Sequence, residues 1–246
     1  MPNHRQSALL KGVTSKQIDN AIFMSQSPDA GQLLLVRHGE QVWPDRLAPV
    51  GEWVDPPLSD LGHRQAAAVA GYLADTKVDV IYSSKLERAR DTAAAIAGHY
   101  PFDVIEIEEL EEIRMFNELP QDVSAVETLG LLEFAQMHDQ FRKTRKWDAY
   151  ERGERSSQFR ERIVNALQTI LDDNRGSTVA VVCHGGVKNV YLSHLLGLEV
   201  DMFFRPKHCS VSRVRFDDHG QVIDTLNEYT FLADAGLTNS GKPSWE

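Results

Sequence analysis

Short apolar runs alternate along the chain with segments of helical periodicity, and this alternation constrains the fold more than any other feature. Leu33–Val36 is a short apolar run next to charged residues, a pattern typical of a buried strand. Further strand-like runs occur at 78–84, 102–107 and 177–183, with helical segments at 59–75, 86–100 and 186–197. Such β-α alternation is typical of a parallel sheet with helices on both faces. We therefore predict an α/β fold: a three-layer α/β/α sandwich with a mostly parallel central sheet.

Three further regions complete the predicted organisation. The runs at 209–216 and 221–229 alternate like a terminal hairpin around a turn at 217–220. The stretch from about Arg114 to Arg155 breaks the alternation, and we expect a helical insertion over the C-terminal edge of the sheet. Its aromatic residues are expected to fasten the insertion to the core rather than to bind substrate: Phe134, Phe141, Trp147 and Tyr150. The domain is expected over residues 32–232, between a flexible lead-in at 1–31 and a C-terminal tail at 233–246.

Composition narrows the function classes. The formal net charge of −10 argues against general affinity for nucleic acid or an anionic membrane, so an anionic substrate would require a local basic pocket. No apolar stretch approaches the roughly 20 residues that span a bilayer, and the N-terminus lacks the apolar core of a secretory signal. Cys183 and Cys209, both in apolar runs, are typical of buried free thiols in a reducing compartment. We expect a cytoplasmic protein, with a homodimer as the candidate assembly.

Ionisable residues directly follow the strongest strand-like runs. Arg37, His38 and Glu40 come after the first run, and His184 comes after the run at 177–183. In open α/β sheets ligands bind beyond the carboxyl ends of the strands, so both histidines should reach one sheet edge. Arg88 and Arg90 begin a helix that follows another strand, where the helix N-terminus favours anions. Because the guanidinium fork pairs with two phosphate oxygens, the cluster predicts a phosphate pocket.

Four motifs give the chain a resemblance to a known family. They are "RHGE" at 37–40, "PLSDLGHRQA" at 57–66, "SSKLERARDTA" at 83–93 and "CHGG" at 183–186. In this order and at these spacings they resemble the histidine phosphatase, or phosphoglycerate mutase-like, superfamily from Leu33 to about Phe216. The resemblance implies an α/β/α sandwich, no metal or other cofactor, and a phosphohistidine intermediate formed from a small phosphate ester.

The resemblance also implies residue roles. His38 matches the nucleophile, His184 matches the second catalytic, phosphate-binding histidine, and Arg37, Arg88 and Gly185 match phosphate-binding positions. Arg90 matches no functional position. Neutral imidazole is the form that attacks phosphorus, and fixed cationic donors stabilise the transferring group.

The resemblance also implies that the proton donor is a glutamate two residues after a leucine, just after the third strand. The stretch "ELEEIR" supplies Glu112 two residues after a leucine, with Glu111 as the reserve. A carboxyl group serves as acid only if burial or nearby phosphate raises its pKa. We expect supporting roles for Glu40 and His208. A metal site of His38, His184 and Glu40 is the chief chemical alternative, but the neighbouring arginines would repel a cation.

Phosphatases and mutases of this family share the core motifs. "EWVDPPLS" resembles the mutases, but Pro44 stands where that branch has asparagine, and "IRMFNELP" replaces its glycine-containing run. The arginines that bind the substrate carboxylate are not evident, although Arg142, Arg145 and Arg152 are available. We therefore expect a phosphatase, with phosphoglycerate mutase-type transfer as the alternative and a non-catalytic phosphate-binding regulator as a third reading.

Overall fold

A six-stranded mixed sheet forms the centre of the computed structural model, which describes residues 30–238. The spatial order of the strands is β3-β2-β4-β1-β5-β6, with β1–β4, β4–β2 and β2–β3 parallel and β5 and β6 antiparallel. The strands are β1 (Gly31–Arg37), β2 (Val80–Ser84), β3 (Val104–Ile107), β4 (Thr178–Cys183), β5 (Val211–Asp217) and β6 (Gly220–Glu228). The predicted mostly parallel sheet and the terminal hairpin are confirmed.

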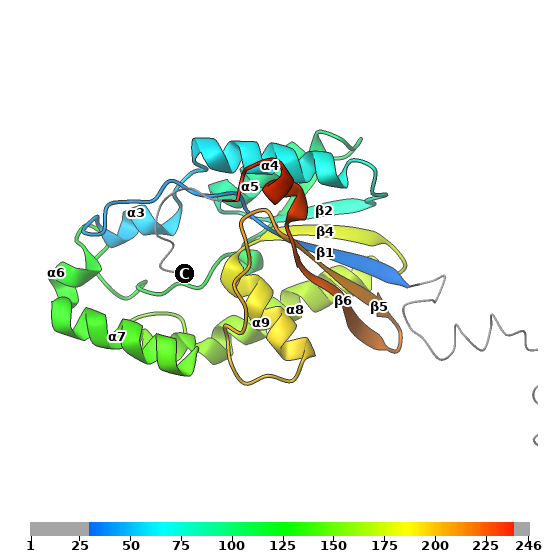
Figure 1. Cartoon of the computed structure of the whole chain (residues 1–246). Coiled ribbons are helices and arrows are strands. Elements are labelled where there is room, and N and C mark those ends of the chain that lie inside the picture. Colours follow the sequence, from blue (N-terminus) through cyan, green and yellow to red (C-terminus); the bar gives the residue numbers. More distant parts are fainter. Residues whose placement is uncertain (1–29, 239–246) are drawn as a thin grey trace, which may run out of the picture.

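Helices cover both faces of the sheet, as predicted (Figure 1). On one face lie α4 (Asp60–Leu73), α5 (Glu87–Ala97) and α10 (Thr230–Asp234); on the other lie α8 (Ser156–Asp173) and α9 (Gly185–Leu195). Alternate residues of β1 pack in the two hydrophobic cores on either side of the sheet, because side chains of a strand point to opposite faces. Leu34 and Val36 pack with α4 and α5, whereas Leu33 and Leu35 pack with α8 and α9. The three-layer α/β/α sandwich is therefore confirmed.

Two helices differ from the sequence-based expectation. Helix α8 was not predicted, although its buried side chains recur at helical spacing and contribute the following to the core: Phe159, Ile163, Leu167, Ile170 and Leu171. The short helix α3 (Val50–Val54) was also missed, because only Val50 of its five residues is buried and no apolar stripe marks it. Ser59 caps α4, with its Oγ accepting the Gly62 N–H at 3.1 Å.

The predicted insertion contains α6 (Ala125–Leu129), α7 (Leu131–Thr144) and the 3-10 helix η3 (Trp147–Ala149), and another 3-10 helix, η2 (Glu108–Leu110), precedes it. In Figure 1, α6 and α7 lie beyond the carboxyl ends of the parallel strands, near α3. Aromatic rings fasten this segment to the core: Phe141 stacks on Trp147 with centroids 4.5 Å apart, and both Trp147 and Tyr150 are buried. The insertion therefore frames the edge where His38 and His184 leave the sheet.

The termini and the cysteines complete the description. The expected lead-in lies outside the described residues except for 30 and 31, and residues 239–246 of the expected tail also lie outside them. Cys183 and Cys209 are buried and free, but Cys209 precedes β5 instead of belonging to a strand. None of the described helices is long and apolar enough to cross a membrane.

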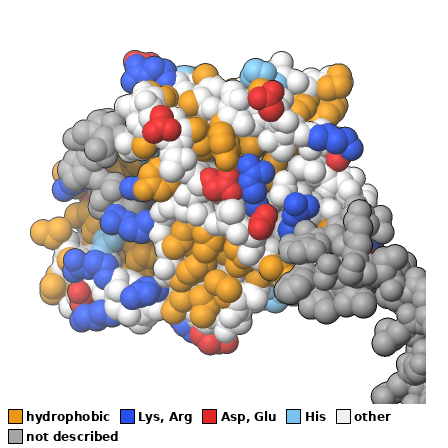
Figure 2. Space-filling model, turned by 45° about the vertical axis from the view of Figure 1, so that its right-hand side comes forward, with side chains coloured by type: hydrophobic (Ala, Val, Ile, Leu, Met, Phe, Trp, Pro, Cys, Tyr) orange, Lys and Arg blue, Asp and Glu red, His pale blue; other side chains and the backbone are white. Residues whose placement is uncertain are grey.

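Charged side chains of both signs are interspersed over the face drawn in Figure 2, where apolar side chains gather below the middle. Lys and Arg side chains gather toward the lower left of that face. In a chain with net charge −10, positive charge attracts an anion more effectively where it is buried, because solvent screening is weak there. The ends of the two central strands bring such buried charge together.

Candidate active site

Strand register brings His38 and His184 together. β1 and β4 are neighbours, and Arg37 pairs with Cys183, so the next residue of each strand leaves the sheet at the same level. The His38 N–H continues the ladder by donating to the Cys183 carbonyl at 2.9 Å. The two imidazole centroids are 5.1 Å apart, and both residues are buried. Two histidines far apart in sequence thus lie side by side at the carboxyl edge of the sheet.

The surroundings of His38 favour a neutral ring with one nitrogen available. Its Nδ1 lies 2.6 Å from the Gly39 carbonyl, which can only accept, so we assign the ring proton to Nδ1. The lone pair then lies on Nε2. Burial lowers the pKa of His38 well below its usual value, and the charges of Arg88, His184 and Arg37 lower it further. The ring is therefore neutral near pH 7, which is the form able to attack phosphorus.

His184 is oriented by a serine that sequence reasoning did not single out. Its Nε2 lies 2.8 Å from the Ser84 Oγ, and that oxygen also accepts the Leu86 N–H at 3.3 Å. If the Ser84 hydroxyl donates to Nε2, Nδ1 carries the proton. Within residues 30–238 this buried Nδ1 has no hydrogen-bond partner, which suits a donor to a phosphate oxygen. Burial, Arg88 and Arg37 lower the pKa of His184 well below its usual value.

Two buried arginines supply the positive charge. Arg37 donates from Nη1 to the Pro206 carbonyl at 2.6 Å. Arg88, in the first turn of α5, donates from Nη1 to the Val54 carbonyl at 3.2 Å and contacts Asp55 Oδ1 at 3.5 Å. Their exposed fractions are 6% and 4%. Both stay protonated at any relevant pH, and their charge acts at short range without strong solvent screening.

Gly185 and Gly186 open α9 beside these cations. The first N–H groups of a helix lack partners within the helix and favour anions. A Cβ at Gly185 would lie 3.5 Å from the Arg37 Nε, and one at Gly186 would lie 2.3 Å from the Glu112 Oε1. The second glycine is therefore needed for the close approach of a carboxylate.

Glu112 reaches the site from the segment after η2. Its Oε2 accepts the Gly186 N–H at 3.0 Å, and its Oε1 accepts the Ile113 N–H at 3.1 Å. Burial raises the pKa of Glu112, against the opposing effects of these N–H groups, Arg88 and Arg37. Glu111 instead pairs with Arg114 at 3.1 Å and is not part of the cluster. The geometry therefore places Glu112 in the cluster and Glu111 outside it, a choice that the sequence left open.

The remaining candidates occupy supporting positions. Glu40 accepts the Ser59 hydroxyl at 2.9 Å, and its N–H donates to Gln65 Oε1 at 2.8 Å, so it ties the strand end to α4. The ring of His208 lies 5.6 Å from that of His38. Thr92, which had been given no role, accepts the Gly39 N–H at 3.0 Å; its place in "RARDTA" was the available signal.

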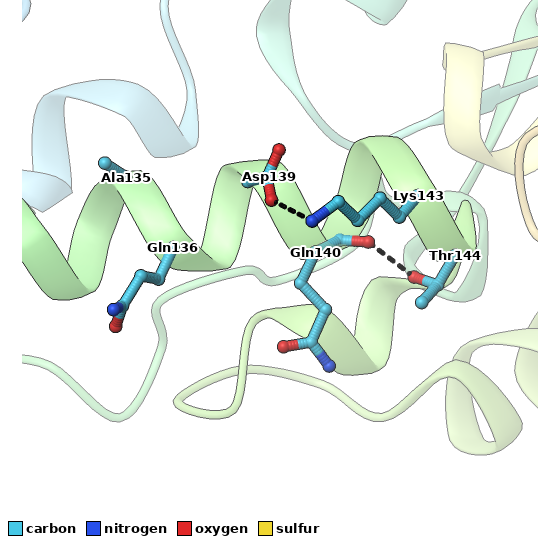
Figure 3. Close-up of a pocket in the computed structure, with 6 residues that line it drawn as sticks. All are labelled: Ala135, Gln136, Asp139, Gln140, Lys143 and Thr144. Carbon is cyan, nitrogen blue, oxygen red and sulfur yellow. Dashed lines mark hydrogen bonds and ion pairs between the residues drawn. The ribbon is translucent and has the colours of Figure 1, made fainter.

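Other predicted alternatives lie apart from the cluster. Arg90 is exposed, Arg142 pairs with Asp139, and Arg145 and Arg152 are exposed. A hollow on α7 is lined by neutral side chains and by one ion pair, in which Lys143 is bonded to Asp139 (Figure 3). In the part of the chain that the structure describes, no group of three or more His, Cys, Asp or Glu side chains could hold a metal ion.

Fold and site together define a phosphoryl-transfer protein built on a pair of histidines. The chain belongs to the histidine phosphatase superfamily (branch 1), whose family model matches residues 33–229. A metal-independent phosphoserine phosphatase of Arabidopsis thaliana is 28% identical over 218 residues, 85% of this chain and 87% of that protein. A probable phosphoglycerate mutase (GpmB) of Yersinia enterocolitica is 31% identical over 212 residues, 82% of this chain and 94% of that protein.

A solved structure shows the same similarity. A mutant phosphoserine phosphatase of Entamoeba histolytica, in complex with phosphoserine, aligns with a TM-score of 0.65 and 25% identity. The alignment covers 82% of this chain and 99% of that chain. The family suggested by the four sequence motifs is therefore confirmed.

Proposed function

We propose that this protein is a phosphomonoesterase that hydrolyses a small phosphorylated metabolite of the phosphoserine type through a phosphohistidine on His38. The observation that carries the proposal is the pair of buried, neutral imidazoles, whose pKa values two buried arginines help to lower. A neutral nucleophile beside fixed positive charge is what transfer of a phosphoryl dianion requires. Similarity to two phosphoserine phosphatases supports the choice of substrate class.

The first half-reaction moves the phosphoryl group to His38. Arg37, Arg88 and the His184 N–H would hold the phosphate oxygens while the His38 Nε2 lone pair forms the P–N bond. The P–O bond to the leaving group breaks, and the departing alkoxide takes the proton of the Glu112 carboxyl. The raised pKa of Glu112 keeps part of the enzyme in this protonated form. The products are a phosphohistidine and a free alcohol.

The second half-reaction returns the enzyme to its starting state. The Glu112 carboxylate takes a proton from water, whose oxygen attacks phosphorus. The P–N bond breaks and its electron pair returns to the His38 Nε2, which releases inorganic phosphate. A mutase would instead pass the phosphoryl group to a second hydroxyl of the substrate. Pro44 and the run "IRMFNELP", which replace features of the mutases, favour hydrolysis.

Product analysis in the presence of a chelator tests this function. Phosphoserine, 2-phosphoglycerate and 3-phosphoglycerate should release inorganic phosphate faster than the two phosphoglycerates interconvert. The wild type should form an acid-labile, base-stable phosphoenzyme, and His38→Ala should lose at least about 10³-fold in rate. His63→Ala changes an exposed histidine and should leave the rate unchanged. Faster interconversion than hydrolysis would replace the phosphatase with the mutase alternative, and activity lost on chelation and restored by a divalent ion would refute metal independence.

The same proposal includes the cellular setting. Two free thiols suit the reducing cytoplasm, where we place the enzyme. A homodimer stays a prediction.

A further inference from the structure

Lys188 is a buried cation that the proposed reaction does not use. It lies in the first turn of α9, four residues after His184, and its exposed fraction is 0%. Its Nζ donates to the Ser210 carbonyl at 2.8 Å and to the Ser210 Oγ at 3.1 Å. Among residues 30–238 it forms no ion pair with a carboxylate, and burial lowers its pKa to about 7. A buried, unpaired amine is unfavourable for folding, so its position calls for a physical reason.

The reason lies in the carbonyl that Lys188 contacts. The Ser210 carbonyl also accepts the Arg37 backbone N–H at 3.1 Å. The preceding residue, Cys209, donates its N–H to the Arg37 carbonyl at 3.0 Å and to the His38 carbonyl at 3.2 Å. Residues 209 and 210 therefore hold the backbone of the phosphate-binding arginine and of the nucleophile.

The turn at residues 209 and 210 has a strained backbone conformation. Cys209 has φ 54°, in the left-handed region that a residue with a Cβ seldom adopts, and it is fully buried. Such a conformation persists only where surrounding contacts determine it. The two hydrogen bonds from Lys188 to the next residue are contacts of this kind.

The loop before this turn also reaches the site. Its Pro206 carbonyl accepts Nη1 of Arg37, and its His208 ring lies beside His38. Asn189, the neighbour of Lys188, binds the start of the loop: its Oδ1 accepts the Phe203 N–H at 2.9 Å, and its Nδ2 donates to the Phe204 carbonyl at 3.2 Å. Lys188 and Asn189 of α9 thus hold residues 203–210 at both ends.

We propose that Lys188 is a positioning residue for phosphate binding: by holding Ser210, it fixes the strained turn that orients Arg37 and His38. This role rests on the proposed function, because it assumes that Arg37 binds the phosphate. Lys188 need not contact the substrate, and it acts through backbone hydrogen bonds that the site shares. The inference identifies a determinant of phosphate affinity that lies outside the reacting groups.

A double-mutant cycle tests the proposal. Lys188→Met keeps the length of the side chain but removes the donors to Ser210. We expect the inhibition constants of inorganic phosphate and vanadate, and the KM for p-nitrophenyl phosphate, to rise at least 10-fold in this variant. In an Arg37→Ala background the same change should raise them less than 3-fold, since Lys188 acts largely through Arg37. These constants do not depend on the fraction of folded enzyme, so a purely structural role would leave them unchanged.

Lys77→Met is the control, because it alters a lysine whose side chain is 87% exposed, and it should change none of the three constants. If Lys188→Met shows no cooperative thermal transition, Ser210→Ala, which removes only the hydroxyl acceptor, enters the same cycle with a smaller effect in the same direction. Unchanged constants in a folded variant, or equal effects in both backgrounds, would overturn the proposal. Phosphate binding, followed by the rise in Tm that it causes, is measured without turnover; failed hydrolysis would therefore refute the proposed function and leave this test intact.

Discussion

Replacement of Glu112 by glutamine separates proton donation from every other role of this side chain. The carboxylate uses one oxygen for the Gly186 N–H and the other for the Ile113 N–H. A glutamine amide has nearly the same shape but only one oxygen, and it has no acidic proton to give to a leaving group. Glu112→Gln should therefore keep the fold of the segment while it removes the proposed general acid.

The expected magnitudes follow from these contacts. One of the two N–H groups loses its acceptor, which costs about 1–3 kcal/mol of unfolding free energy. Loss of a general acid reduces the rate by about 10² to 10⁴, or about 3 to 5 kcal/mol in the barrier. This loss applies only where the leaving group needs a proton. We expect it in full for phosphoserine and a change of less than about 3-fold for p-nitrophenyl phosphate.

The assay compares kcat/KM for the two substrates. For the proposed reaction, kcat/KM reports only the steps up to departure of the leaving group. It therefore excludes the later hydrolysis of phosphohistidine, in which Glu112 would act as a base. Glu111→Gln is the matched control, because its carboxylate pairs with Arg114 instead of contacting α9. It should leave kcat/KM for both substrates within about 2-fold, as expected for a partly exposed ion pair.

Equal losses of kcat/KM on both substrates would refute the reasoning. Glu112 would then be a structural acceptor for the start of α9, and Glu111 or Glu40 would have to be tested as the acid. A slow p-nitrophenyl phosphate reaction that still shows a burst of p-nitrophenol would not contradict it. Such a burst would place the defect in the second half-reaction.

Two further predictions concern the same pocket. Gly186→Ala should displace the Glu112 carboxylate, since the added Cβ would lie 2.3 Å from Oε1, and it should slow hydrolysis of phosphoserine much more than that of p-nitrophenyl phosphate. Gly71→Ala is the control, because a Cβ there would meet open space. It should preserve activity and stabilise α4 by up to about 1 kcal/mol. Equal effects of the two glycine variants would contradict the close approach. The unfolding free energy should fall as pH decreases below about 6.5, because unfolded His38 and His184 bind protons there and the folded ones, with lowered pKa values, do not. His38→Gln should reduce this slope by up to about 1.4 kcal/mol per pH unit in urea titrations, and an unchanged slope would mean that His38 is protonated in the folded protein.

Much of the candidate site could be predicted, because its residues directly follow strands that the sequence pattern indicates. His38 and His184 each follow a buried apolar run, so the sheet edge that they share follows from the sequence pattern alone. Arg88 belongs to a recognisable helix start. The choice between Glu111 and Glu112 lacked such support, because the chain after β3 is irregular and adjacent residues there point in different directions. Only the contact with Gly186 distinguishes them.

Residues whose roles depend on tertiary contacts could not be predicted from the sequence pattern. Ser84 was visible only as part of a strand, and Lys188 and Asn189 only as polar positions in an apolar helix. Their roles depend on the loop at 203–210, which is distant in sequence and has no periodicity. The same limitation applies to α3, which buries one side chain and is held by its neighbours more than by its own pattern.

The sheet positions the two histidines and the insertion lies beyond its edge, and this separation affects how new substrate preferences can arise. The spacing of the two histidines is set by the β1–β4 ladder, and its register does not involve residues 114–155. That segment is fastened by its own aromatic rings, by Asp201, which accepts the Trp147 N–H at 2.9 Å, and by backbone hydrogen bonds to α3. We expect an exchange for the equivalent segment of another family member to leave the histidine pair in place. Glu112 lies just before the junction and would remain with the recipient. We therefore expect that substrate specificity can change by exchange of this segment while the phosphoryl-transfer step stays the same.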